Sequence, residues 1–357
     1  MAEAAPGAVR GRAVVDASPA SGQTPAMTQG FQIGDVHIPG RVLLAPMTGV
    51  TDLPFRQAAC RLGAAYVATE MVACTELARG RPDVVRRAAV GEGLPLTVIQ
   101  LVGRTAEWLA AGARMAEAAG ADIIDLNFGC PCKEVTGALS GSALMRDPDE
   151  AERLIAAAVE ATSRPVTLKM RLGWDDARRN APEIARRAEQ AGVKAITVHG
   201  RTRQQFYKGA ADWAAVAEVK AAVRVPVIVN GDVVDAASAR EALARSGADA
   251  VMVGRGAVGR PWLAAELDAS LSSGADTADA VAEARLGVAM DHMAGSLAFY
   301  GERLGLRVFR KHLAAYVEQA PWPVCAQARR EARARLCRLE HPAEVEAGLR
   351  DLWLWAA

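Results

Sequence analysis

Eight short apolar runs lie along the chain, and each of them ends in polar residues. The runs are rich in β-branched residues and show little polar alternation, which is typical of parallel strands covered on both faces. They begin at Val42, Ala65, Leu96, Asp122, Val166, Ala195, Val227 and Ala250. Alanine-rich amphipathic stretches separate most of them and predict helices over residues 105–119, 149–161, 181–191 and 235–246.

This alternation predicts an α/β fold, a (β/α)8 TIM barrel, with a doubly wound sheet as the alternative. Polar residues at the strand ends favour the barrel, because the carboxyl ends of all barrel strands meet at one rim. These residues are Met47, Thr48, Glu70, Gln100, Asn127, Lys169, Arg171, His199, Asn230, Asp232 and Arg255. We therefore expect them to form a single site.

The pattern becomes wholly helical after residue 278, which predicts a barrel domain over residues 31–277 and a helical domain over residues 278–357. Residues 301–340 contain nine Arg or Lys against four Glu. Arg307, Arg310 and Lys311 share one helical face by their spacing. An RNA-binding surface and an ordinary solvated helix both fit this charge.

The N-terminal segment lacks the apolar core of a signal peptide. We expect residues 1–30 to be a disordered tail, unless the true start is Met27. No apolar run reaches the roughly 18–20 residues of a spanning helix, so no membrane association is expected.

Composition narrows the class of protein. The chain has 357 residues, of which 51% are hydrophobic, so it can build a large core and is not a disordered chain. A net charge of +1 argues against a basic coat over the whole molecule. The six cysteines are too few and too irregularly spaced for a disulfide framework, which predicts a reduced, cytoplasmic location.

Asn127 and Cys130 follow the strand ADIIDL and open a Gly- and Ser-rich loop over residues 127–148, which suits a lid. A thiol with an ordinary pKa near 8.5 is mostly protonated at neutral pH and can act as a general acid. A nucleophilic role would require a partner histidine, for which His199 is the candidate. Cys132 is expected to be a packing or spectator thiol.

Lys169 and Arg171 lie two residues apart in VTLKMR and therefore share one face of a strand. Burying two cations without a partner is costly. Either the internal carboxylates of Glu70 and Asp125 accompany them, or an anionic ligand does. A reduced flavin, which carries negative charge at its N1/C2=O edge, is such a ligand.

Two glycine-containing turns suit a flat, phosphorylated ligand. In APMTGVTD, Pro46, Met47 and Gly49 allow close backbone approach, although a plain turn capped by Thr51 or Asp52 explains them equally well. VIVNGD and VMVGRGAVGRPW end the seventh and eighth runs, the phosphate-binding positions of a barrel. We interpret GRGAVG as a phosphate loop and not as a Rossmann turn.

His199 is followed by the basic loop GRTRQQFYKG. A single histidine after an apolar run is more often structural than functional. No second His or carboxylate lies at metal-ligand spacing from it, and the CxC of Cys130 and Cys132 is not a zinc spacing. The sequence therefore predicts no metal.

Seven motifs occur in one order: APMTGVTD, VIQLVG, DLNFGCP with SGSALM, VTLKMRLGW, ITVHGRTR, VIVNGD and VMVGRGAVGRPW. With them the chain resembles the bacterial tRNA-dihydrouridine synthases, most closely the B type, over about residues 31–320. The resemblance implies a TIM barrel that holds FMN and a helical domain that binds tRNA. It also implies reduction of the C5=C6 bond of uridine, with NADPH or NADH reducing the flavin and the flavin N5 delivering hydride to C6.

The resemblance also implies residue roles. Cys130 would be the general acid that protonates C5, and Asn127 and Arg171 would orient the uracil. The residues that would hold FMN are Pro46, Met47, Thr48, Gln100, Lys169, His199, Asn230, Gly231, Asp232, Gly254 and Arg255. The residues expected to contact RNA are Arg203, Lys208, Arg307, Arg310 and Lys311.

The chain departs from the family at Cys132 and Thr48, where relatives usually carry a small residue. The Cys132 thiol bears on the sensitivity of the protein to oxidation, and the hydroxyl of Thr48 should be tolerated. Two rival functions stay open from the sequence: an FMN-dependent dehydrogenase of free pyrimidines or dihydroorotate, and a non-catalytic tRNA-binding protein. A monomer is expected.

Overall fold

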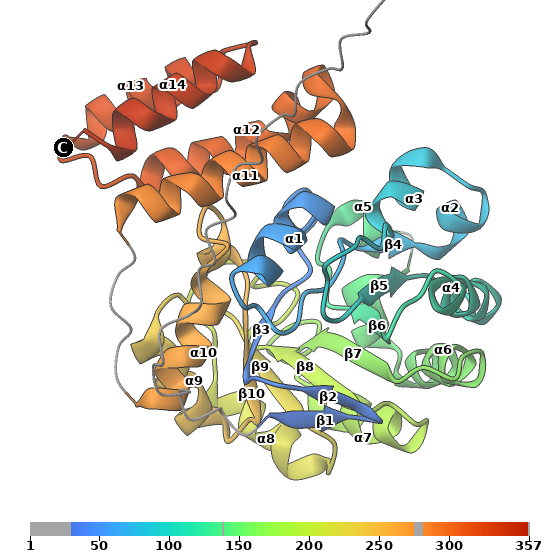
Figure 1. Cartoon of the computed structure of the whole chain (residues 1–357). Helices are drawn as coiled ribbons and strands as arrows, with labels where there is room; N and C mark the ends of the chain where they lie inside the picture. The colour runs from blue at the N-terminus through green and yellow to red at the C-terminus, as the bar shows by residue number, and fades with distance from the viewer. Residues whose placement is uncertain (1–29, 138, 275–280, 356–357) are drawn as a thin grey trace, which may run out of the picture.

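The computed structural model describes residues 30–137, 139–274 and 281–355. It consists of a barrel of strands and helices and a helical region that lies over one side of the barrel mouth (Figure 1). The predicted boundary at residue 278 and nearly all of the predicted tail lie outside the described residues.

The barrel is built on an eight-stranded parallel sheet. In sheet order its strands are β3 (Val42–Leu44), β10 (Ala250–Val253), β9 (Val227–Asn230), β8 (Ala195–His199), β7 (Val166–Arg171), β6 (Ile123–Phe128), β5 (Val98–Val102) and β4 (Val72–Ala73). The sheet closes because Leu44 of β3 pairs with Val67, and Ala68 pairs with Val98 of β5. Closure confirms the barrel and excludes the doubly wound sheet.

The second predicted strand differs from its prediction. Residues 65–70 form only isolated bridges, although the amides of Leu44 and Thr69 donate to the carbonyls of Tyr66 (3.0 Å) and Val98 (2.9 Å). The regular strand β4 follows at Val72–Ala73. The apolar run therefore fills the expected place in the barrel but lacks a continuous ladder.

Helices surround the sheet. They are α1 (Leu53–Arg61), α2 (Cys74–Ala78), α3 (Pro82–Arg87), α4 (Ala106–Ala118), α5 (Lys133–Thr136), α6 (Pro148–Glu160), α7 (Ala181–Gln190), α8 (Ala214–Ala222), α9 (Ala236–Ser246) and α10 (Leu263–Ser273), with two 3-10 turns, η1 (Gly141–Arg146) and η2 (Arg255–Ala257). The four helices predicted from the pattern are confirmed to within one residue. Their starts are fixed by side-chain caps, among them Thr105 on α4, Asp147 on α6 and Asp235 on α9.

A hairpin that the apolar pattern did not predict covers the amino end of the barrel. Its strands are β1 (Phe31–Ile33) and β2 (Val36–Ile38), which pair antiparallel. Ile33 and Ile38 are buried against inward-facing barrel residues that include Val98 and Met252. The hairpin closes this end of the barrel, so the cleft described below opens at the opposite, carboxyl end.

Four helices form the C-terminal region: α11 (Ala282–Tyr300), α12 (Glu302–Gln319), α13 (Ala326–Leu336) and α14 (Pro342–Trp353). They share a core of their own, in which Phe309, Leu313 and Leu349 are fully buried. Helix α11 packs on α1 of the barrel, and the Tyr300 hydroxyl donates to the Asp52 carboxylate (3.1 Å). This contact places the helical region beside the first βα loop.

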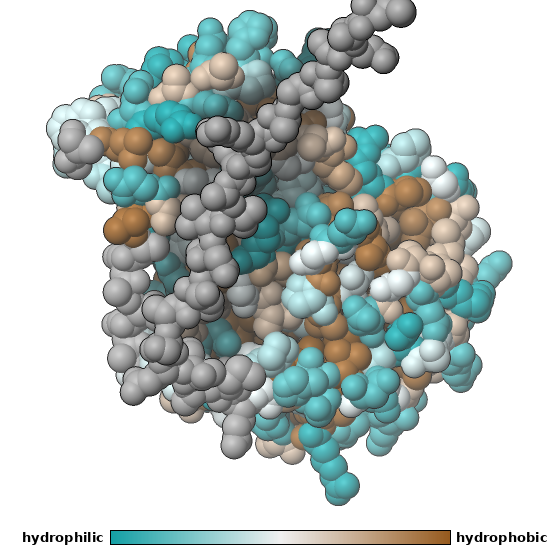
Figure 2. Space-filling model, viewed as in Figure 1, coloured by the Kyte–Doolittle hydropathy of each residue, from teal (hydrophilic) through white to brown (hydrophobic). Residues whose placement is uncertain are grey.

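The face seen in Figure 2 is mostly hydrophilic, with separate hydrophobic patches and no continuous apolar belt. Among the described residues, none of the helices combines the length and the apolar content needed to span a bilayer.

Candidate active site

Two adjoining cavities of about 370 Å³ and 390 Å³ form one cleft at the carboxyl ends of the strands. Both cavities are lined by Pro46, Met47, Lys169, His199, Tyr207 and Arg255. One end continues to residues 230–234 and 254–256, and the other continues to Gln100, Asn127, Cys130 and Arg171. Every residue predicted to bind the cofactor, orient the base or donate a proton lines this cleft.

A chain of hydrogen bonds fixes the side-chain amides of Gln100 and Asn127 at the end of the cleft that contains Cys130. The Gln100 Nε2 donates to Asp125 (2.6 Å), and its Oε1 accepts from the Asn127 Nδ2 (2.8 Å). Asp125 can only accept, so it determines which way the Gln100 amide points. The Asn127 Oδ1 then accepts from the backbone amide of Cys130 (2.9 Å). The buried carboxylate thus orients a polar group at the cleft surface.

Cys130 is held in place by its backbone. Its carbonyl accepts hydrogen bonds from the amide (3.1 Å) and the hydroxyl (2.8 Å) of Ser142 in η1, which folds the loop back over the strand end. Burial raises the pKa of the Cys130 thiol to about 11, while the nearby charge of Arg171 lowers it only in part. At neutral pH the thiol is therefore protonated and suited to proton donation.

Cys132 is exposed and hydrogen-bonds with the Cys130 thiol, so of the two expected roles, packing or spectator, packing in the core is excluded and a spectator thiol stays a prediction. All six cysteines of the chain are free thiols, which agrees with the expectation of no disulfide framework.

Lys169 and Arg171 do share one side of β7 and both reach the cleft. The Lys169 ammonium donates to the Asn230 Oδ1 (3.0 Å), and burial lowers its pKa to about 8. The Arg171 guanidinium donates to the backbone carbonyls of Gly129, Thr202 and Phe206 at 2.7–3.0 Å.

The two carboxylates considered as internal partners do not pair with these cations. Glu70 accepts from the Gly49 amide, and Asp125 accepts from Gln100 and Thr167. Asp125 acts on Lys169 only through space, where it partly offsets the effect of burial on the pKa. Within the described residues, no ion pair therefore neutralises the positive charges of Lys169 and Arg171.

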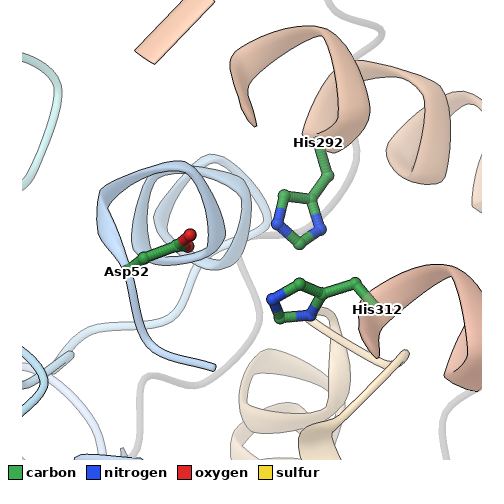
Figure 3. Close-up of side chains that lie close together, drawn as sticks. All are labelled: Asp52, His292 and His312. Carbon is green, nitrogen blue, oxygen red and sulfur yellow. The ribbon is translucent and has the colours of Figure 1, made fainter. Parts of the chain in front are cut away.

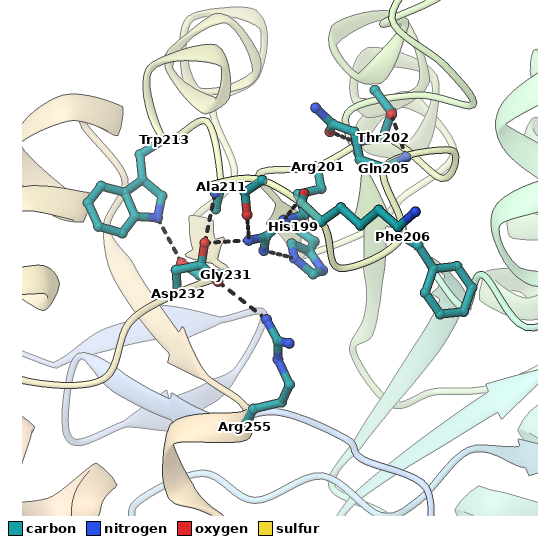
Figure 4. A network of polar contacts seen from close by, with 12 residues as sticks. His199, Arg201, Thr202, Gln205, Phe206, Ala211, Trp213, Gly231, Asp232 and Arg255 are labelled. Carbon is teal, nitrogen blue, oxygen red and sulfur yellow. Dashed lines mark hydrogen bonds and ion pairs between the residues drawn. The ribbon is translucent and has the colours of Figure 1, made fainter.

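Arg201 and Asp232 connect the side chains at the end of the cleft that contains residues 230–234 and 254–256 (Figure 4). The Arg201 guanidinium, which is 1% exposed, contacts the His199 Nε2 at 3.2 Å and the Asp232 carboxylate at 2.5 Å. Arg255 approaches the other Asp232 oxygen (3.4 Å) and lies over the ring of Tyr207. Asp232 therefore positions two arginines.

His199 is neutral. Because guanidinium can only donate, the Nε2 of His199 accepts and its Nδ1 carries the proton. Burial, together with the charges of Lys169, Arg171, Arg201 and Arg255, holds the pKa of His199 well below its usual value. A histidine with four cations around it marks a strongly positive part of the cleft.

Glycine is required at the end of β9. Gly231 has φ +114°, and a Cβ there would lie 2.8 Å from the Ala211 Cβ and 2.9 Å from the His199 ring. At Gly254 a Cβ would meet nothing closer than Ala45 at 3.9 Å and Met47 at 4.0 Å. Both of these neighbours line the cleft, so a side chain at Gly254 would project into the space between them.

Comparisons with known proteins identify the family of the chain. The model of the family described as "Dihydrouridine synthase (Dus)" matches residues 43–352. The chain belongs to the dihydrouridine synthase family. It is 53% identical to the "Probable tRNA-dihydrouridine synthase" of Rhodobacter capsulatus over 320 residues, which is 87% of this chain and 94% of that protein.

Two further similarities concern the sequence and the fold. It is 44% identical to the "tRNA-dihydrouridine synthase B" of Xanthomonas axonopodis over 82% of this chain and 88% of that protein. Its fold also resembles that of a 2-naphthoyl-CoA reductase complex, with a TM-score of 0.55 and 13% identity, over 70% of this chain and 52% of that one. The predicted family and barrel are confirmed.

The predicted RNA contacts of this dihydrouridine synthase lie outside the cleft. Lys208 and Arg307 are exposed, and Arg203 lies over the ring of Trp174. The Lys311 ammonium is close to Gly49, where an added Cβ would lie 2.5 Å from it. Lys311 thus brings positive charge from the helical region to the first βα loop.

Arg310 differs from the expected exposed face. Its Nη2 donates to the Leu339 carbonyl (3.3 Å), and its Nε is buried without a hydrogen-bond partner in the described residues. It connects α12 to the segment before α14. Helical spacing alone does not reveal this contact, because Leu339 lies in a later part of the chain.

Sequence reasoning missed the functional position of Arg201 and Tyr207. Arg201 was noted only as part of a basic loop, yet it is buried between His199 and Asp232. Tyr207 lines both cavities and lies under Arg171 and Arg255. The adjacent aromatic residues in QQFYKG were the available signal, because exposed aromatics in a basic loop favour ligand contact.

Proposed function

We propose that this protein reduces the C5=C6 bond of uridines in tRNA to 5,6-dihydrouridine, with FMN as its cofactor and NADPH, or NADH, as the reductant. The observation that carries the proposal is that the Cys130 and Lys169 side chains line the same cavity, together with Asn127 and Arg171. The tRNA substrate is inferred from the names of the relatives.

The cleft fits FMN in shape and charge. Pro46 and Met47 offer an apolar surface to a flat ring, and the cleft is open beside Gly254, where an added Cβ would lie no closer than 3.9 Å to another residue. Arg255, beside the Gly231–Asp232 turn, suits a phosphate group at the first end of the cleft. Lys169 would hold the N1/O2 edge of the ring, with Thr48, Gln100, His199 and Asn230 as further contacts.

When bound, FMN supplies the hydride that reduces C6 of the uracil ring. Hydride addition leaves negative charge on the base, which a proton at C5 removes. The Cys130 thiol donates this proton, because its raised pKa keeps it protonated and its loop directs it into the cleft. Asn127 and Arg171 bind the polar edge of the uracil and orient it.

A uridine inside tRNA must leave its stack before it can enter the cleft, at a cost of a few kcal/mol. Contacts to the phosphate backbone offset this cost. Arg203, Lys208, Arg307 and Lys311 supply them, and residues 278–357 act as the tRNA-binding domain. The enzyme works as a cytoplasmic monomer, and no metal takes part in the reaction itself.

The rivals from the sequence are a dehydrogenase of free pyrimidines and a tRNA-binding protein without activity. The test is turnover on bulk tRNA from a strain that lacks dihydrouridine, compared with turnover on free uracil and uridine. We expect dihydrouridine in tRNA and negligible turnover of the free compounds. Faster turnover of free pyrimidines would contradict the proposal, and so would a colourless protein that does not take up FMN.

A further inference from the structure

Three side chains from distant parts of the chain meet where the helical region packs on the barrel (Figure 3). Asp52 lies at the start of α1, His292 on α11 and His312 on α12. One ligand atom from each lies within 4.8 Å of the other two. The histidines are 0% exposed and Asp52 is 4% exposed, so bulk water does not reach the group.

Three ring nitrogens in this group have no hydrogen-bond partner among the described residues. They are both nitrogens of His312 and the Nε2 of His292. Buried polar atoms are normally paired, because an unpaired one loses the bonds it made to water and gains none in return. An ion can take one nitrogen from each ring, so the Nε2 of His292 and one nitrogen of His312, beside a buried carboxylate, point to a bound cation.

Hydrogen bonds to the other atoms of His292 and Asp52 leave a lone pair free for a metal ion on each of these residues. The Nδ1 of His292 lies 3.1 Å from the Tyr316 hydroxyl, which leaves the Nε2 lone pair available. The two Asp52 oxygens accept from the Phe55 amide and the Tyr300 hydroxyl, each at 3.1 Å, and each keeps a second lone pair. Such outer contacts orient the ligands in known metal sites.

The surroundings and the donor atoms select the kind of ion. The ring of Phe55 stacks on His312 at 5.2 Å, and Phe309 meets the edge of His292 at 5.2 Å, so the walls are apolar. Two imidazole nitrogens and one carboxylate oxygen suit Zn²⁺ and similar transition metals, whereas Mg²⁺ and Ca²⁺ prefer oxygen ligands alone.

We propose that Asp52, His292 and His312 bind one divalent transition-metal ion of the zinc type, which fastens the helical region to the barrel. Coordination at about 2.0–2.1 Å brings the ligand atoms to about 3.4 Å from one another, so the two rings and the carboxylate turn inward when the ion binds. The site is structural and does not line the cleft. Spacing could not reveal it, because each ligand comes from a different part of the chain.

The test measures zinc in the purified full-length protein after chelator treatment, loading with ZnCl2 and desalting. We expect about one zinc per chain in the native protein and at least about tenfold less retained zinc in Asp52→Asn and His312→Gln. Asp52→Asn is informative because asparagine still caps α1 and preserves the fold. His341→Gln, at an exposed histidine, is the matched control and should bind zinc like the native chain.

X-ray absorption at the zinc edge identifies the ligands. The site predicts nitrogen and oxygen neighbours only, whereas zinc–sulfur distances would assign the ion to the cysteines and overturn the proposal. A native protein that keeps no zinc after desalting, or equal zinc in Asp52→Asn, His312→Gln and the native chain, would also overturn it.

Discussion

Lys169 and Cys130 line one cleft, and burial moves the pKa values of the two groups in opposite directions. Burial lowers the pKa of Lys169 to about 8 and raises that of Cys130 to about 11. Between these values the thiol stays protonated while the ammonium loses its charge. The effects of the two groups can therefore be separated by pH.

The first prediction concerns the rate at which NADPH reduces the bound flavin. The rate should fall as pH rises through about 8, because the Lys169 cation that stabilises the negatively charged reduced ring is lost. In Lys169→Arg the guanidinium stays charged, so the rate should remain level over the same range. Stopped-flow absorbance measures the rate of flavin reduction in both proteins at several pH values. The same fall of this rate in Lys169→Arg would argue against charge stabilisation by Lys169.

Single residues in the cleft were predictable where a strand end supplied them. Asn127, Lys169 and His199 each follow a buried run, and barrel geometry alone brings such positions together. The partners of these residues were not predictable, because they come from tertiary contacts. The pairing of Arg171 with three carbonyls, instead of with Glu70 or Asp125, depends on how the loops after β6 and β8 fold.

At the scale of elements, the turn after β9 determines the shape of the phosphate end. Gly231→Ala should abolish most FMN binding, because its Cβ would press on the His199 ring, and it should destabilise the fold by about 1–3 kcal/mol through its positive φ. Gly80→Ala is the matched control, since Gly80 also has positive φ (+67°) but nothing within 4 Å of an added Cβ. Fluorescence titration measures the affinity for FMN, and thermal unfolding measures the loss of stability caused by backbone strain. Equal FMN affinity in both variants would contradict this account of the turn.

Helix α12 gives the third prediction. Arg307→Glu should weaken tRNA binding and reduce its salt dependence by about one phosphate contact, with no change in melting temperature or in flavin reduction by NADPH. Arg310→Glu should instead lower the melting temperature, because the native side chain is half-buried against the Leu339 carbonyl. Filter binding at several salt concentrations and thermal unfolding measure the two effects. Unchanged tRNA affinity in Arg307→Glu would count against α12 as an RNA-binding surface.

Helices and strands could be predicted where the hydrophobic pattern along the sequence is regular. The four amphipathic helices were located to within one residue because their apolar faces and caps are encoded locally. The hairpin of β1 and β2 and the short strand β4 were not, since two or three residues carry no period. Residues 65–70, the second apolar run, show that an apolar segment can take the place of a barrel strand while it forms only isolated bridges to its neighbours.

At the scale of the whole molecule, the proposed function assigns the helical region and the barrel to different parts of one tRNA substrate. The barrel supplies the cleft, and α12 carries Lys311 to the loop that borders it. The sequence revealed both parts, because one is alternating and the other wholly helical. It could not reveal how they are joined, since Asp52, Tyr300, His292 and His312 converge only in the folded chain.

The central claim is that Cys130 donates the proton that completes reduction of the uracil ring. The most direct measurement is dihydrouridine formed in a single turnover by enzyme whose flavin has already been reduced, with Cys130→Ala compared with Cys132→Ala. Cys130→Ala should keep its FMN and its reduction by NADPH but form dihydrouridine at least about 100-fold more slowly, while Cys132→Ala stays close to the native rate. A native yield and rate in Cys130→Ala would contradict the account.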